Sequence, residues 1–242
     1  MPETLVLLHG FSGTHRAWDG VIDRLPAERY RPLALDLPGH GARSGDPPPI
    51  TFDGCVRAVL DTAPERFELC GYSLGGRVAL HVALAAPDRV TRLVLIGANP
   101  GIEDPQERSA RRAADERQAE RLESEPYEDW IESWRSQPLF AADPPHVGEL
   151  ARADQRRNDP LALAAAMRGL SAGSMRPLWS RLGTLPMPVT LVAGSRDGKF
   201  CALAERALPL LRNGTLTVLD GGHGLPLEDP AGVAATLEAA PG

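Results

Sequence analysis

Short, continuous apolar runs recur along the chain and alternate with segments of helical periodicity. Six such runs, rich in Leu, Val, Ile and Ala, lie at residues 5–8, 32–35, 67–70, 93–96, 189–193 and 216–219. A strand that is apolar at every position is typical of a parallel sheet that helices cover on both faces. Helical patterns at residues 75–86 and 201–211 follow two of the runs. The alternation therefore predicts right-handed βαβ units in a mostly parallel, doubly wound α/β sheet.

One long segment, residues 103–185, interrupts this alternation. It contains no run typical of a strand, and its charged helical stretches lie at residues 104–124, 126–136, 144–157 and 161–170. Prolines separate these stretches, as expected where helices begin and end. We therefore expect an α/β core of residues 1–102 and 186–242, with residues 103–185 inserted as a helical lid, or cap, over the strand ends. A helical appendage that does not contact the site is the alternative.

The sequence Gly71–Gly75 (G-Y-S-L-G) lies where the third apolar run ends and a helix is predicted to begin. Its glycines permit a sharp, strained turn that lifts the Ser73 hydroxyl clear of the backbone. The helix N-terminus adds a positive field and free backbone N–H groups. This context predicts serine-centred chemistry with main-chain stabilisation of a negative oxygen, although the same pattern also occurs in ordinary tight turns.

A serine hydroxyl needs an imidazole to accept its proton, and the imidazole needs a carboxylate to set its tautomer. Asp197 follows the fifth apolar run, and His223 follows the sixth in a glycine-rich turn. Because the carboxyl ends of parallel strands share one edge of the sheet, these side chains are expected to meet Ser73 there. We therefore assign Ser73, Asp197 and His223 as a catalytic triad in the chain order Ser…Asp…His.

Two backbone donors and one arginine complete the site predicted from the residues. The glycine turn after the first run can direct the Phe11 N–H into the pocket, and the Leu74 N–H follows the serine, so the two would form an oxyanion hole. Arg77 lies one helical turn after Ser73 on the same face. An unpaired guanidinium packed against the sheet is costly, so we interpret Arg77 as the partner of a substrate carboxylate. An internal Asp or Glu is the alternative partner.

Composition excludes several functional classes. A formal net charge of −6 argues against a nucleic-acid partner and a basic membrane-binding surface. No apolar run approaches 18 residues, and residues 1–4 lead into a strand without a signal-peptide pattern. The three cysteines do not suggest a disulfide framework, and zinc-type spacings are missing, so we expect no metal. We expect a cytoplasmic protein that binds neither nucleic acid nor membrane.

Together these motifs resemble the α/β-hydrolase superfamily over almost the whole chain. Within it, the sequence is most similar to the 2-succinyl-6-hydroxy-2,4-cyclohexadiene-1-carboxylate synthases of menaquinone biosynthesis. The similarity rests on L-H-G-F, G-Y-S-L-G-G-R, G-A-N-P-G-I, E-R-x-A-R-R-x-x-D, W-x-x-Q-P-L-F and D-G-K-F, at residues 8–11, 71–77, 97–102, 107–115, 134–140 and 197–200. The arginine after the double glycine and the N-P-G-I-E-D segment are more specific than the superfamily motifs.

The resemblance implies an α/β-hydrolase fold and a lyase that uses no cofactor. Such enzymes remove a proton from 2-succinyl-5-enolpyruvyl-6-hydroxy-3-cyclohexene-1-carboxylate and expel the enolpyruvyl group as pyruvate. Ser73 would act as the general base, and the oxyanion hole would hold the charge on the succinyl ketone oxygen. By motif position, five residues would contact this multi-carboxylate small molecule: Tyr72, Arg77, Arg111, Trp134 and Arg156. Arg112 and Arg157 are alternatives to the second and third arginines.

Two other functions fit the same residues. A cytosolic carboxylesterase or thioesterase would use the same triad but would not need a cationic pocket around Arg77. A non-catalytic small-molecule receptor on this fold could lose Ser73, Asp197 or His223, and all three are present. For the assembly state, we expect a monomer or a small homo-oligomer.

Overall fold

The computed structural model describes residues 2–141 and 143–239. At its centre lies a six-stranded sheet in the order β2-β1-β3-β4-β5-β6, in which all neighbouring strands are parallel. The predicted runs are all confirmed as strands, each slightly longer than expected. The strands are β1 (Glu3–Leu8), β2 (Tyr30–Leu35), β3 (Phe67–Tyr72), β4 (Val90–Ile96), β5 (Val189–Gly194) and β6 (Gly214–Leu219).

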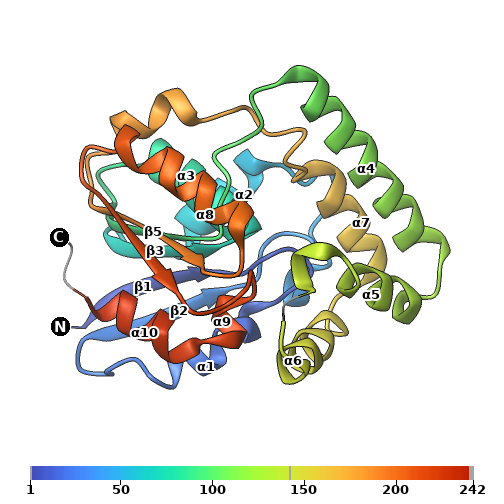
Figure 1. Cartoon of the computed structure of the whole chain (residues 1–242), viewed down its shortest axis with the longest axis horizontal. Coiled ribbons are helices and arrows are strands. Elements are labelled where there is room, and N and C mark those ends of the chain that lie inside the picture. The colour runs from blue at the N-terminus through green and yellow to red at the C-terminus, as the bar shows by residue number, and fades with distance from the viewer. Residues whose placement is uncertain (1, 142, 240–242) are drawn as a thin grey trace.

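Helices cover both faces of the sheet, so the predicted doubly wound α/β fold is confirmed (Figure 1). On one face lie α2 (Phe52–Thr62), α3 (Leu74–Ala85) and α8 (Gly198–Ala207). On the other face lie α1 (Asp19–Ile22), α9 (Leu225–Glu228) and α10 (Pro230–Glu238). Short 3-10 turns are found at His15–Trp18, Gly41–Arg43, Pro138–Phe140, Trp179–Thr184 and Leu208–Leu210.

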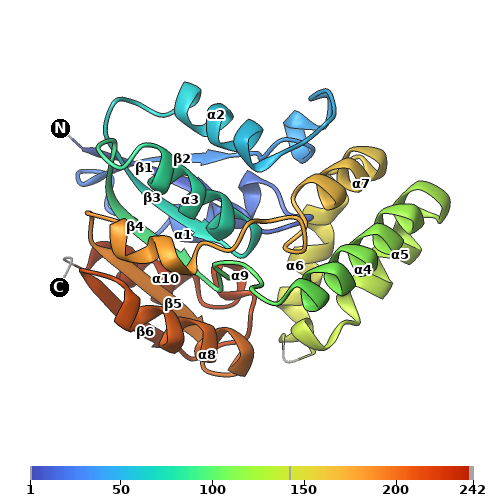
Figure 2. The same ribbon diagram turned by 90° about the horizontal axis from the view of Figure 1, so that it is seen from above.

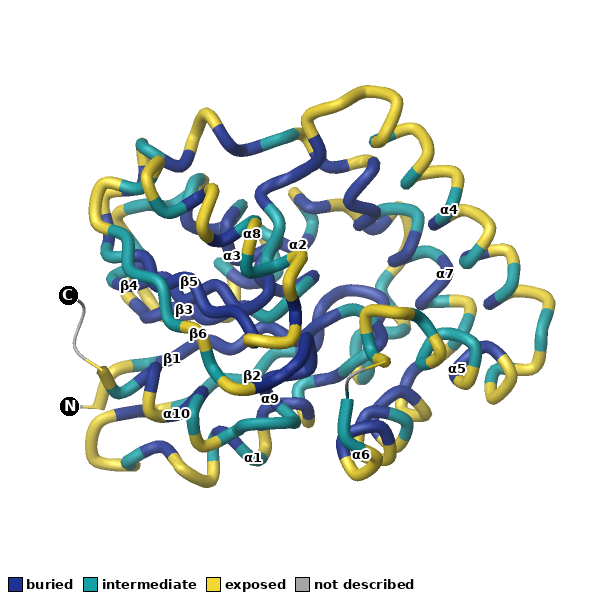
Figure 3. The backbone as a smooth tube through the Cα atoms, viewed as in Figure 1, coloured by how far each residue is buried: buried dark blue, intermediate teal, exposed yellow. Residues whose placement is uncertain are grey.

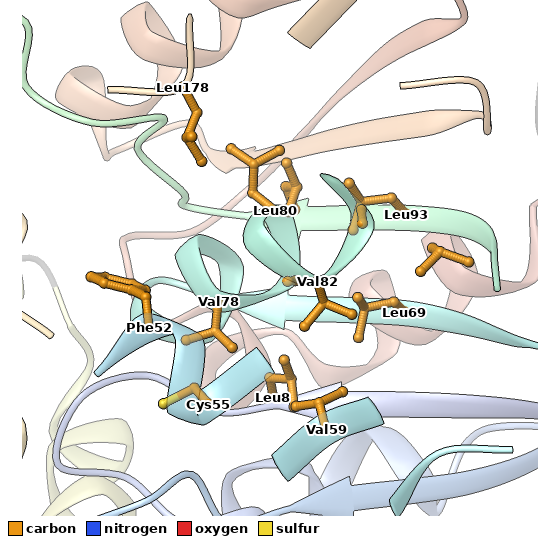
Figure 4. Packing of buried hydrophobic residues seen from close by; sticks show 14 of the residues in the cluster. Leu8, Phe52, Cys55, Val59, Leu69, Val78, Leu80, Val82, Leu93 and Leu178 are labelled. Carbon is orange, nitrogen blue, oxygen red and sulfur yellow. The ribbon is translucent and has the colours of Figure 1, made fainter. Parts of the chain in front are cut away.

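Both faces need apolar side chains because successive residues of a strand point in opposite directions. In β1, Leu8 belongs to the core beside α2 and α3, whereas Leu7 belongs to the core that contains Trp18. Figure 4 shows the first of these cores, where Leu69 of β3 and Leu93 of β4 lie beside α3. This two-sided burial explains why the strands read as continuous apolar runs.

Between β4 and β5 the chain leaves the sheet and forms the four helices predicted there. They are α4 (Pro105–Ser124), α5 (Tyr127–Arg135), α6 (Pro145–Gln155) and α7 (Pro160–Gly169). These helices lie together at one end of the sheet (Figure 2). Several of their buried residues form an apolar cluster that includes Leu122, Trp130 and Leu163, whereas Ala166 of α7 packs in the core beside α2 and α3. We call residues 103–185 the helical insertion.

Local sequence explains where two of these helices begin. The Asp104 carboxylate accepts hydrogen bonds from the backbone N–H groups of Gln106 and Glu107, and Asp159 accepts one from Ala162. Each aspartate is followed by a proline, which suits the first helical position. The α4 helix is exposed along much of its length (Figure 3), which accounts for its charged sequence. No helix among the described residues is both long and apolar enough to span a membrane.

Candidate active site

A cavity of about 710 Å³ lies between the carboxyl ends of the strands and the helical insertion. Residues from the loops after β1, β3, β4, β5 and β6 line one side of it, and residues of α4, α6 and the α5–α6 connection line the other. Parallel strands place their following loops at a common edge, where ligands bind in folds of this type. The predicted catalytic side chains belong to three of these loops.

Ser73 lies in a sharp turn between β3 and α3. Its backbone has φ +53° and ψ −109°, a conformation that a residue with a Cβ rarely adopts. The turn requires glycine nearby: a Cβ on Gly71 would lie 2.3 Å from the Gly75 carbonyl oxygen, and one on Gly75 would lie 2.1 Å from the Leu8 oxygen. The Ser73 N–H donates to the Ile96 carbonyl oxygen at 2.8 Å. The motif therefore forms the strained turn that its glycines predict.

The structure brings Ser73, His223 and Asp197 together. The Ser73 Oγ lies 3.0 Å from His223 Nε2, and His223 Nδ1 lies 2.7 Å from Asp197 Oδ2. The His223 and Asp197 side chains are buried, and Asp197 also accepts a hydrogen bond from the Phe200 N–H. At Gly97, where φ is +54°, a Cβ would lie 2.9 Å from His223 Cε1, so glycine leaves room for the imidazole. This geometry can pass a proton from the serine to the imidazole.

The two predicted oxyanion donors follow β1 and Ser73. Phe11 lines the cavity, and Leu74 begins α3 beside the nucleophile. Within the described part of the chain, neither backbone N–H donates a hydrogen bond to another protein group. Close approach is needed here too, because a Cβ on Gly10 would lie 2.8 Å from the Tyr72 ring. Both N–H groups are therefore available to an oxyanion.

Arg77 lines the cavity and is partly buried. Its Nη1 donates to the Leu170 carbonyl oxygen at 2.7 Å, and no carboxylate among the described residues forms an ion pair with it. The Arg77 pKa is lowered to about 10, mainly by burial and also by nearby Arg111, while Asp115 acts in the opposite direction. The guanidinium remains charged at neutral pH. It is a cation positioned to accept a carboxylate from a ligand.

Of the two neighbouring arginines on α4, Arg111 lines the cavity and Arg112 does not. Arg111 Nε donates to both oxygens of Asp115 at 2.9 Å. Asp115 also accepts a hydrogen bond from the Ser171 hydroxyl at 2.6 Å. Arg112 instead donates to the Gly173 carbonyl oxygen. The structure thus places Arg111, already paired, at the cavity.

Aromatic residues line another part of the cavity. The Tyr72 ring lies 5.4 Å from the His223 ring, and burial raises the pKa of the Tyr72 hydroxyl. Trp134 lines the cavity and stacks on Trp130 at 5.1 Å. Trp130 and Trp179 do not line the cavity; both are buried in apolar cores.

The predicted position of Arg156 against the cavity requires a correction. Neither Arg156 nor Arg157 lines the cavity, and exposed Arg156 pairs with Glu128 of α5 at 2.9 Å. The physical reason is the rotation of the helix. At the end of α6, Asp154 and Gln155 face the cavity and the core. The helical rotation per residue therefore directs the next side chain, Arg156, toward solvent.

Sequence reasoning missed several cavity residues, among them a largely buried ion pair between Arg135 and Asp143. Arg135 Nη2 contacts Asp143 Oδ2, and the guanidinium lies 4.2 Å from the centre of the Phe140 ring. Lys199 also lines the cavity and follows Asp197 in the D-G-K-F motif, which could have signalled it. Nothing in the local sequence indicated the Arg135–Asp143 pair. The described residues include no cluster of three or more His, Cys, Asp or Glu side chains suited to a metal ion.

Comparisons with known sequences agree with this geometry. Residues 5–236 match the alpha/beta hydrolase family. A 2-succinyl-6-hydroxy-2,4-cyclohexadiene-1-carboxylate synthase from Enterobacter sp. (strain 638) is 37% identical over 96% of this chain and 89% of its own length. The protein of the same name from Klebsiella pneumoniae subsp. pneumoniae is 35% identical over 96% of this chain and 91% of its own.

Solved structures are similar over nearly the whole chain. MenH from S. aureus superposes with a TM-score of 0.91 at 28% identity, covering 98% of this chain and 92% of that one. The enol-lactonase from Burkholderia xenovorans LB400 has a TM-score of 0.82 at 19% identity, covering 98% and 90% of the two chains. The second similarity concerns the fold alone.

Proposed function

The chain belongs to the alpha/beta hydrolase family and, within it, to the 2-succinyl-6-hydroxy-2,4-cyclohexadiene-1-carboxylate synthases, and from this premise we propose its reaction and the roles of its residues. It is a pyruvate-eliminating lyase that acts on 2-succinyl-5-enolpyruvyl-6-hydroxy-3-cyclohexene-1-carboxylate. The observation that carries the proposal is an assembled Ser–His–Asp relay that faces the same cavity as Arg77, a cation that pairs with no carboxylate of the described residues.

Ser73 is the general base in this proposal. Its hydroxyl passes a proton to His223 Nε2 as its oxygen removes the ring proton next to the succinyl ketone. Asp197 accepts the hydrogen bond from His223 Nδ1 and stabilises the imidazolium that forms. The negative charge moves to the ketone oxygen, where the Phe11 and Leu74 N–H groups can receive it.

Elimination then restores the neutral ketone. The electron pair of the enolate forms a new ring double bond, the existing double bond shifts, and the bond between the ring carbon and the enolpyruvyl oxygen breaks. One C–H bond and one C–O bond of the substrate are thus broken. The enolpyruvate leaving group takes up a proton at its methylene carbon and becomes pyruvate, so the atoms of the substrate are divided between the diene and pyruvate.

The cavity suits a ligand with several carboxylates. We assign Arg77 to a substrate carboxylate, with Arg111 contributing charge beside it, and Tyr72 and Trp134 as walls for the ring. Arg156 has no role in this assignment because it faces away from the cavity. We also propose that residues 103–185 act as a cap on the core of residues 1–102 and 186–242.

An ester hydrolase could use the same triad, but no observation favours it. A simple ester needs no cationic partner, and the similar proteins named above carry the synthase name. The proposal keeps the expectations of a cytoplasmic enzyme that is a monomer or a small homo-oligomer, binds neither nucleic acid nor membrane, and uses no cofactor.

The proposal is tested by supplying the enolpyruvyl substrate and following pyruvate with a coupled dehydrogenase, beside p-nitrophenyl acetate as an ester control. We expect rapid pyruvate release by the wild-type chain. Ser73→Ala and His223→Ala should each abolish release, because the base or its proton acceptor is lost. Fast ester cleavage with no pyruvate would replace the proposal with the esterase alternative.

A further inference from the structure

The C-terminal end of α6 is hydrogen-bonded to the loop that follows β1 and carries the Phe11 N–H. The Asp154 carboxylate accepts hydrogen bonds from the Thr14 N–H at 2.8 Å and the Thr14 hydroxyl at 2.5 Å. Next to it, Gln155 Nε2 donates to Ser12 Oγ at 2.9 Å. The helical insertion is therefore attached directly to the loop of the predicted oxyanion hole.

Asn158, just beyond α6, adds two further hydrogen bonds. Its Nδ2 donates to the Ser12 carbonyl oxygen at 2.8 Å, and its Oδ1 accepts from the Gly41 N–H at 2.9 Å. Asp154, Gln155 and Asn158 are only 6%, 4% and 6% exposed. Polar side chains are tolerated at such burial where hydrogen bonds replace their contacts with water, and among these three residues only Gln155 Oε1 has no partner within the described part of the chain. We call these three residues the clasp.

The loop held by the clasp has a strained backbone. Ser12 has φ +62°, in the left-handed region that residues other than glycine rarely adopt. The Gly13 N–H donates to the Gly10 carbonyl oxygen at 3.1 Å, so Phe11 and Ser12 form the middle of a tight turn. Strained turns persist where surrounding contacts hold them. The direction of the Phe11 N–H therefore depends on contacts that the clasp supplies.

The position of these hydrogen bonds argues for more than attachment of the insertion. The Arg152–Glu132 ion pair joins α6 to α5 on the exposed surface, and neither of its residues lines the cavity. The clasp, in contrast, bonds on both sides of the Ser12 backbone turn, and Gln155 itself lines the cavity. An oxyanion donor contributes only when it is directed at the developing charge, so small errors in this turn are costly.

We infer that Asp154, Gln155 and Asn158 are positioning residues that hold the Phe11 N–H in its catalytic direction. Through the clasp, the geometry of the oxyanion hole depends on the position of α6. Activity in the core therefore depends on how the helical insertion is placed against it. This inference rests on the proposed function, because it assumes that the Phe11 N–H stabilises charge during the reaction.

Two near-isosteric substitutions test the clasp. Gln155→Met removes the donor to Ser12, and Thr14→Val removes the hydroxyl that donates to Asp154 while the Thr14 backbone N–H remains. Loss of an oxyanion donor lowers kcat by about 10²–10³-fold. These substitutions leave the Phe11 N–H in place but free its direction, so each should lower kcat for pyruvate release by about 10–100-fold. The KM should stay within about twofold of the wild type, because the clasp does not bind substrate carboxylates.

A second measurement isolates the oxyanion hole. A fluorophosphonate labels the triad serine and places its P=O oxygen at the oxyanion donors. In Gln155→Met and Thr14→Val the labelling rate should therefore fall by the same factor as kcat. Thr14→Ser keeps the hydroxyl and should restore both rates. Arg152→Met removes the exposed ion pair on the same helix and should leave both rates unchanged.

The outcomes separate this inference from the proposed function. Suppose that Gln155→Met and Thr14→Val fold and show only a lower melting temperature, with kcat and labelling rate equal to the wild type. That result would overturn the positioning role of the clasp and leave the proposed synthase activity intact. A fall in kcat without a fall in labelling would overturn it as well. If the wild-type chain releases no pyruvate, the proposed function fails. The positioning role of the clasp is then tested by the rate of p-nitrophenyl acetate hydrolysis in the same variants, because that reaction uses the same oxyanion hole.

Discussion

Arg77 illustrates how burial makes a single charge selective. Its guanidinium is held by the Leu170 carbonyl and lies 5.8 Å from the centre of the Phe52 ring, and within the described part of the chain no carboxylate forms an ion pair with it. Burial penalises the charged form, which is why the Arg77 pKa falls to about 10. A ligand carboxylate would relieve that penalty and gain two parallel hydrogen bonds.

Removing this charge should therefore weaken catalysis more than folding. We expect Arg77→Met to lower kcat/KM for pyruvate release by a factor that corresponds to about 2–4 kcal/mol of lost transition-state stabilisation, because a desolvated carboxylate would lose its partner. Arg57→Met, which removes an exposed arginine from α2, serves as the charge-matched control and should retain wild-type kcat/KM. Unchanged turnover in Arg77→Met would refute the assigned role.

At the scale of elements, β3 and β4 hold a buried ion pair at the end of the sheet away from the site. Glu68 and Arg92 are register partners, and Arg92 Nη1 lies 3.8 Å from Glu68 Oε2. The same guanidinium donates to the carbonyl oxygens of Leu237 and Thr236 in α10. The Glu68 pKa is raised to about 7, mainly by burial; the nearby Glu3 carboxyl adds to the rise, and Arg92 opposes it.

This raised pKa predicts how stability depends on pH. The Glu68 pKa is higher in the folded chain than its ordinary 4.5, so its contribution is complete below pH 4.5 and is lost as the pH rises through about 7. Between pH 5 and pH 8 the loss should be about 2 kcal/mol of unfolding free energy. Urea titrations should show that Glu68→Gln removes most of this loss. An equal fall with pH in the variant and the wild type would contradict the prediction.

The whole molecule combines three apolar cores, one on each face of the sheet and one in the helical insertion. Trp18 is fully buried in a core of the sheet, and Trp130 is fully buried in the cluster of the helical insertion. The polar clasp at the end of α6 is one of the connections between the two parts. Trp130 and its neighbours bury apolar residues within the insertion itself, so we expect this part of the insertion to open locally more readily than the sheet.

Matched tryptophan truncations test this division. Trp130→Ala should leave a cavity that destabilises the insertion by about 3–5 kcal/mol, raising hydrogen exchange in α4–α7 more than in the sheet. Trp18→Ala should lower the stability of the sheet and so raise exchange throughout the chain. Equal exchange in both parts of Trp130→Ala would show that the insertion and the core unfold as one unit.

Several parts of this molecule could be predicted without coordinates. The strands could be located because their continuous apolar runs match burial on both faces, as Leu7 and Leu8 show. The four helices of the insertion could be located because prolines and capping aspartates mark their beginnings. Ser73, Asp197 and His223 could be grouped because each follows a strand of a parallel sheet.

Other features depend on packing between elements that are distant in sequence. One helical position separates Arg111 from Arg112, and only the neighbouring segment around Gly173 determines which of them reaches the cavity. The same applies to Arg156, which turns to Glu128 because α5 lies beside it.

The sequence by itself determined the α/β architecture, the long insertion and the order of the triad, because these follow from local periodicity and from the shared edge of parallel strands. Only the tertiary structure decided which insertion side chains face the cavity and that α6 holds the Ser12 turn. A helix face becomes inner or outer only when its neighbour is in place, and a buried hydrogen bond exists only when both partners have been brought together.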